Sequence, residues 1–172
     1  MKKKIGLIVL FFLTPMMFVL PLSASAESVN ISAEKKTKIA ENCESIRESL
    51  VDLQHRDSRA RVYLGRYYQA ILSDFIVPLN VSLLQNSQSD AKLIENQNDF
   101  TNMRGDFTSD YIKYQKDLEE LIAIDCTNEP EKFYEKLTSV REKRAMVEKD
   151  TVRLRELMSQ QVKLVKDLRN SL

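Results

Sequence analysis

The residue types that most often carry catalysis or metal binding are scarce in this chain. His55 is the only histidine, and the two cysteines, Cys43 and Cys126, lie far apart in the sequence. A histidine with no second histidine or cysteine close to it cannot supply the ligands of a zinc site, so a surface residue is the simpler interpretation. Neither a glycine-rich phosphate loop nor a nucleophile elbow occurs. We therefore expect a protein that is not an enzyme, with no catalytic residues, no metal and no cofactor.

The most distinctive local composition lies between Arg56 and Tyr68, where four arginines are interleaved with three tyrosines. Arginine and tyrosine often anchor protein interfaces, and the same residue types can stack on bases and hold phosphates. A third interpretation is a helix whose tyrosines face the core while its arginines are solvated. These three interpretations stay open from the sequence. The functional hypothesis among them is a candidate partner surface formed by Arg56, Arg59, Tyr63 and Arg66.

Charge limits the classes of partner. The chain has 26 basic and 25 acidic residues, for a net charge of +1. Without residues 1–26, which contain three lysines and no acid, 23 basic and 25 acidic residues remain, for a net charge of −2. This balance argues against electrostatic capture of nucleic acid or anionic lipid. We expect a protein partner, and neither nucleic acid nor a small-molecule substrate.

Residues 1–26 have the pattern of a secretory signal peptide. Lysines at positions 2–4 precede an apolar run over 5–22, and Ala24-Ser25-Ala26 is a small-x-small cleavage site. We expect cleavage after Ala26 and export to the extracellular space or to the cell envelope or periplasm. The alternative is an uncleaved membrane anchor formed by residues 5–22, a run nearly long enough to span a bilayer. Association with a membrane is expected only in that case.

Residues 27–172 are predicted to form one all-α domain. They contain only two glycines and two prolines, too few for the turns of a sheet protein. Polar breaks at 86–90 and 126–131 divide them into helices of about 33–85, 91–124 and 130–170. Pro78 predicts a kink in the first helix. Apolar residues at alternating steps of four and three predict that the helices wind around one another, beginning with the seam Ile39, Cys43, Ile46, Leu50, Leu53, Asp57, Ala60, Leu64, Tyr67 and Ile71.

Short connections between helices favour antiparallel neighbours. The predicted fold is therefore an elongated antiparallel three-helix coiled-coil bundle that follows a signal peptide. Asp57 and Arg144 are seam residues of opposite charge on the first and third helices. We expect them to approach each other near Tyr111 or Tyr114. They would form a buried polar layer, which fixes register more reliably than it stabilises the fold.

Cys43 and Cys126 are predicted to form an intramolecular disulfide. Opposed residues of an antiparallel hairpin lie equally far from its turn, and the midpoint of these two positions falls close to the break at 86–90. Paired cysteines normally oxidise in exported proteins. Two free buried thiols or an intermolecular bridge are the alternatives.

Three segments carry a resemblance: residues 61–68, 122–126 and 161–166. With them the chain resembles uncharacterised secreted helical proteins of small-genome bacteria, a resemblance that implies no activity. In plan it is also similar to periplasmic coiled-coil chaperones and adaptors. We expect a secreted or cell-envelope interaction protein, acting as scaffold, adaptor or spacer through exposed helix faces. The alternatives are a periplasmic-type chaperone that holds client chains and a membrane-anchored helical adaptor.

Overall fold

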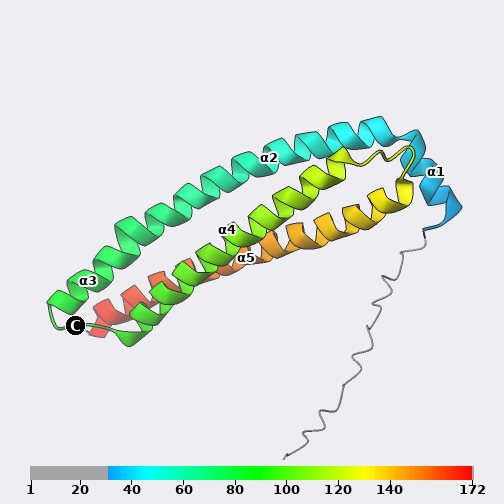
Figure 1. Ribbon diagram of the computed structural model, residues 1–172. Helices are drawn as coiled ribbons and strands as arrows, with labels where there is room; N and C mark the ends of the chain where they lie inside the picture. The colour runs from blue at the N-terminus through cyan, green and yellow to red at the C-terminus, as the bar shows by residue number, and fades with distance from the viewer. Residues whose placement is uncertain (1–30, 172) are drawn as a thin grey trace, which may run out of the picture.

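The computed structural model describes residues 31–171, and no strand occurs in this range. Its helices are α1 (Ala33–Glu41), α2 (Cys43–Ala70), the π-helical turn η1 (Ile71–Ile76), α3 (Val77–Gln85), α4 (Ala91–Ala123) and α5 (Pro130–Ser171). The all-α class is therefore confirmed. The predictions for the signal peptide, its cleavage site and the alternative membrane anchor lie outside the described residues. Figure 1 shows α2, η1 and α3 as one long arm that runs beside α4 and α5.

The helix starts follow from local sequence. The Ser32 hydroxyl accepts a hydrogen bond from the Lys35 amide at 3.3 Å and caps α1. The Asp90 carboxylate accepts one from the Lys92 amide at 2.7 Å and caps α4. These side chains satisfy amide groups that have no partner within the helix. Pro130 opens α5, where its missing N–H costs nothing.

The prediction of one continuous helix over 33–85 is wrong at Asn42. The backbone there leaves the helical geometry, with φ −107° and ψ 14°, and separates α1 from α2. The Asn42 side-chain amide donates to the Lys38 carbonyl at 2.8 Å, a local bond of the kind that competes with helix continuation. An ion pair between Lys36 and Glu131 then connects α1 to α5. The apolar periodicity runs through position 42 without a break, so it could not reveal this change of direction.

Pro78 does not end the arm, which passes through η1 into α3. The Val77 amide donates to the Leu72 carbonyl, five residues back, so the turn before the proline is wider than an α-helical turn. The predicted seam is wrong here. Tyr68, not Tyr67, faces the core, and Tyr67 is 42% exposed while Tyr68 is 2% exposed. Buried residues four apart drift around a straight helix, and a wider turn brings them back into line.

The core lies mainly between α4 and α5, which form the most extensive helix pair of the described residues. One row of buried residues follows a seven-residue spacing, interrupted at Val147, which is only partly buried. The row consists of Leu93, Phe100, Phe107, Tyr114 and Leu121 on α4 and of Phe133, Val140, Leu154 and Gln161 on α5. Other buried residues lie beside this row: Asn96, Tyr111, Asp117, Leu118 and Leu157. The arm contributes to the core at two places, around Cys43 and Leu50 at one end and around Tyr68, Leu72 and Ile76 at the other. Between residues 31 and 171, no helix combines the length and apolar character needed to cross a membrane.

Candidate interaction surface

The outer side of α2 carries a surface that we call the aromatic–basic face, formed by Arg59, Val62, Tyr63, Arg66 and Tyr67. The Tyr63 side chain is 70% exposed. Its ring stacks on that of Tyr67, with centroids 6.4 Å apart and planes 3° from parallel. The face therefore presents a stacked aromatic pair in a hollow that two arginine side chains also line. Such a pair offers a large contact area at low entropic cost.

The four residues of the predicted partner surface are all exposed, but they do not all line one hollow. Arg59, Tyr63 and Arg66 line the same shallow hollow. Arg56 lines a different one, between α2 and the start of α5, together with Phe133. The difference is one of position along the helix, because Arg56 lies seven residues before Tyr63, or about 10 Å at the α-helical rise of about 1.5 Å per residue.

Two members of the aromatic–basic face, Val62 and Tyr67, were missed by the sequence analysis. Tyr67 was assigned to the core because it continued the heptad. Two consecutive tyrosines cannot both point inward on one helix, and Tyr68 takes the inward position. Its ring meets the rings of Phe100 and Phe107 edge-on, at centroid distances of 6.1 and 5.9 Å. That pair of contacts excludes Tyr67 from the core and leaves it beside Tyr63.

A second hollow, which we call the apolar groove, begins at Tyr67 and runs between the arm and the C-terminal part of α5. It encloses about 730 Å³ and is lined by Tyr67, Ile71, Phe75, Ile76, Leu79, Met158, Gln161, Val162, Val165 and Lys166. Phe75 is 70% exposed and Val162 is 55% exposed. This groove was not predicted from the sequence. Its signal was the run of residues 75–77, three apolar residues that cannot all face one core.

Asp57 and Arg144 contact each other directly across α2 and α5. Arg144 Nε lies 2.8 Å from Asp57 Oδ2 and Nη2 lies 3.3 Å from Oδ1, and the Tyr114 hydroxyl donates to Oδ2 at 2.7 Å. The layer is not buried as predicted, since the Arg144 side chain is 50% exposed and that of Asp57 is 18% exposed. A hollow between α2 and α5 opens this side of the pair to solvent. Burial raises the pKa of Asp57, but the hydrogen bonds from Arg144 and Tyr114 outweigh it and hold the pKa below its usual value.

A double-mutant cycle is expected to show coupling between Asp57 and Arg144. Asp57→Leu should lower the free energy of unfolding by about 1–2 kcal/mol, because Tyr114 and Arg144 both lose their acceptor. With Arg144→Leu added, the total loss should fall below the sum of the two single losses by about 0.5–1 kcal/mol, a discounted figure for a half-exposed pair. Urea denaturation gives the free energy of unfolding of the wild type, the two single variants and the double variant. A coupling no larger than that of the surface pair Arg153 and Glu156 would contradict the expectation.

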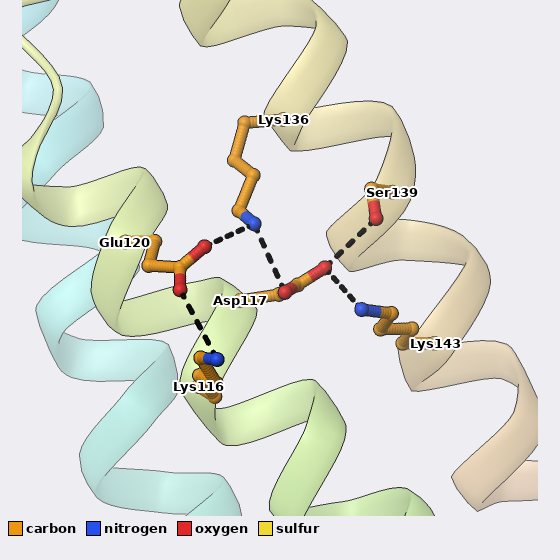
Figure 2. Close-up of polar contacts among 6 residues, drawn as sticks. All are labelled: Lys116, Asp117, Glu120, Lys136, Ser139 and Lys143. Carbon is orange, nitrogen blue, oxygen red and sulfur yellow. Dashed lines mark hydrogen bonds and ion pairs between the residues drawn. The ribbon is translucent and has the colours of Figure 1, made fainter.

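The most extensive ion-pair network joins α4 to α5 at Asp117 and was missed by the sequence analysis. Figure 2 shows its carboxylate between side chains from two turns of α5. It accepts hydrogen bonds from Lys136 at 2.9 Å, Ser139 at 2.8 Å and Lys143 at 2.6 Å. Lys136 also pairs with Glu120. Burial raises the pKa of Asp117, but these donors outweigh it and bring the pKa far below its usual range. The available signal in the sequence was the position of Asp117 directly before Leu118, which belongs to the apolar four–three pattern of the predicted helix 91–124.

The remaining chemistry-bearing residues form no site. Cys43 and Cys126 are joined in a disulfide and both are buried, and His55 is exposed. Within the described part of the chain, no three His, Cys, Asp or Glu side chains are placed to hold a metal ion. Comparison of the chain with models of protein families, with curated proteins and with solved structures finds no match.

Proposed function

We propose that this protein is an exported interaction module, a scaffold or adaptor of the cell envelope or extracellular space, that binds a protein partner through the aromatic–basic face. The supporting observation is the stacked pair of Tyr63 and Tyr67 in a hollow that Arg59 and Arg66 also line. Large aromatic rings held in water do not stabilise an isolated chain, and contiguous exposed apolar surface marks interaction sites. Arginine and tyrosine are also enriched among the residues that dominate binding energy. The proposed role is binding and not catalysis.

The proposal includes the finer architecture. The folded part is an elongated antiparallel three-helix coiled coil, and a signal peptide over residues 1–26 directs it out of the cytoplasm. The seven-residue spacing of the buried side chains on α4 and α5 supports the coiled coil. The disulfide supports export, because such bonds persist in oxidising compartments. In this architecture the arm presents its outer side to a partner along its length.

Reversing the charge at Arg59 and Arg66 is expected to weaken capture of the partner by at least about tenfold, because both side chains line the same hollow as the proposed aromatic anchors. The experiment is crosslinking and pull-down from the native cell envelope, with the double variant Arg59→Glu and Arg66→Glu. Both side chains are exposed, so helical content by circular dichroism should not change.

The matched control is Lys92→Glu with Lys149→Glu, which makes the same change of charge at exposed positions of α4 and α5. Wild-type capture by the control and lost capture by the arginine double variant would support the proposal. Equal capture by both variants would remove the aromatic–basic face from consideration.

A chaperone that holds client chains is the second candidate. The observation that favours it is the apolar groove, with Phe75 and Val162 exposed at its walls. A chaperone of this kind binds many unfolded chains without selecting among them, whereas an adaptor captures a defined partner. Suppression of aggregation of an unrelated unfolded protein therefore distinguishes the two functions.

A further inference from the structure

We propose that the apolar groove is the docking site for one amphipathic helix of a partner protein, about three turns long, with acidic residues along its edges. This partner class rests on the proposed function. The groove meets the aromatic–basic face at Tyr67, which lines both hollows. The two surfaces therefore form one continuous strip, and a single partner can contact both.

The walls of the groove are two rows of apolar side chains on two helices. Ile71, Phe75 and Leu79 lie four residues apart on the arm, and Val162 and Val165 lie on α5. Among the described residues, α3 packs against α4, but α3 and α5 do not form an extensive contact with each other. The arm is therefore held by α4 on one side and leaves a trough beside α5 on the other. A helix laid in this trough buries Phe75 and Val162 against its own apolar face.

The dimensions and backbone chemistry of the trough favour a helix as the occupant. Its lining spans residues 67–79 on the arm, or about 18 Å at the α-helical rise of about 1.5 Å per residue, which matches about three turns. Both walls are helices, whose backbone groups are already paired, so they offer nothing to the ladder of an extended peptide. A helix satisfies its own backbone and needs only side-chain contacts, as in other helix-in-groove complexes.

Charge selects the kind of helix. Among the described residues that line the groove, the one charged side chain is the cation Lys166, and the hollow that continues from the groove at Tyr67 adds Arg59 and Arg66. A partner helix with glutamate or aspartate at its edges complements these cations, while a basic helix is repelled.

The test uses the full disulfide-bonded chain and two labelled peptides of about 18 residues, long enough for appreciable helix formation. Both carry leucine at heptad positions a and d. One has glutamate at the flanking positions and the other has lysine there. Fluorescence anisotropy gives the two dissociation constants. We expect the glutamate peptide to bind at least about tenfold more tightly than the lysine peptide.

Val162→Glu is expected to weaken binding of the glutamate peptide by at least about tenfold, because it places a like charge in the trough. The matched control is Val152→Glu, the same substitution on the same helix at an exposed position that does not line the groove. Loss of binding in Val162→Glu alone would support the inference.

Three outcomes would overturn the inference: equal binding of the two peptides, equal effects of the two valine variants, or equally tight binding of an unfolded protein. A concentration-dependent dimer in ultracentrifugation that Val162→Glu dissolves would overturn it too, since a second copy of the chain would then occupy the groove. None of these results tests the proposed function, which depends on the aromatic–basic face. That function fails if Arg59→Glu with Arg66→Glu captures the partner as well as the control Lys92→Glu with Lys149→Glu does.

Discussion

Replacing Cys43 and Cys126 with alanine is expected to lower the free energy of unfolding by about 4 kcal/mol. The disulfide closes a loop across 83 positions, and chain-entropy reasoning gives about this value for a loop of that size, as an upper estimate. Small domains are stable by only about 5–15 kcal/mol, so the loss is a large fraction of the total. Alanine is preferred to serine because Cys126 is fully buried, where a hydroxyl without a partner would add its own cost.

Without the disulfide, the loss of stability should be concentrated at one end of the molecule. The bond joins the first turn of α2 to the loop between α4 and α5, close to the break at Asn42. Hydrogen exchange should therefore rise in α1 and the first turns of α2, while the α4–α5 pair stays protected. Urea denaturation of the wild type with and without reductant is the control that needs no substitution. Identical midpoints for the oxidised and reduced chains would contradict this account.

Asp117→Asn is expected to lower the free energy of unfolding by about 2 kcal/mol. Asp117 is the shared acceptor for Lys136, Ser139 and Lys143, and a hydrogen bond to a charged group contributes about 1.5–3 kcal/mol. The lower part of that range applies because the two lysine side chains are 22% and 33% exposed. Removing the carboxylate also leaves two ammonium groups of like charge close together. Urea denaturation at neutral pH measures the loss.

The difference in free energy of unfolding between the wild type and Asp117→Asn is expected to depend on pH. The folded-state pKa of Asp117 lies far below its usual value, so the folded protein binds this proton less readily than the unfolded chain does. The stabilisation is complete well above the unfolded pKa of about 3.9 and is lost as pH falls toward the folded pKa. The difference between wild type and Asp117→Asn should thus stay constant above about pH 5 and narrow below about pH 4.

Glu34→Gln is the control for both measurements, because it breaks a pair with Lys38 in which both side chains are more than two-thirds exposed. Exposed pairs of this type contribute at most about 0.5 kcal/mol. A loss of similar size in Asp117→Asn, or a difference from wild type that does not change with pH, would show that the network does not stabilise the fold as described.

The sequence alone determined the all-α class and the helix bounds of α4 and α5 to within one residue. It also paired two sets of distant residues, Cys43 with Cys126 and Asp57 with Arg144. Both successes have one physical basis. Periodicity defines which side of a helix is apolar, and short connections require antiparallel neighbours. Positions at equal distances from a turn must then lie opposite each other, whatever the detailed packing.

Only the tertiary structure decided which of several adjacent apolar residues faces the core. Periodicity assigned Tyr67 to the core, but the rings of Phe100 and Phe107 accommodate Tyr68, and Tyr67 is left on the surface. Asp117 becomes buried for a similar reason, since its neighbourhood is built by lysines from another helix. The apolar groove depends on the separation between the arm and α5. That separation is set by side-chain packing across three helices, a property that no single stretch of sequence contains.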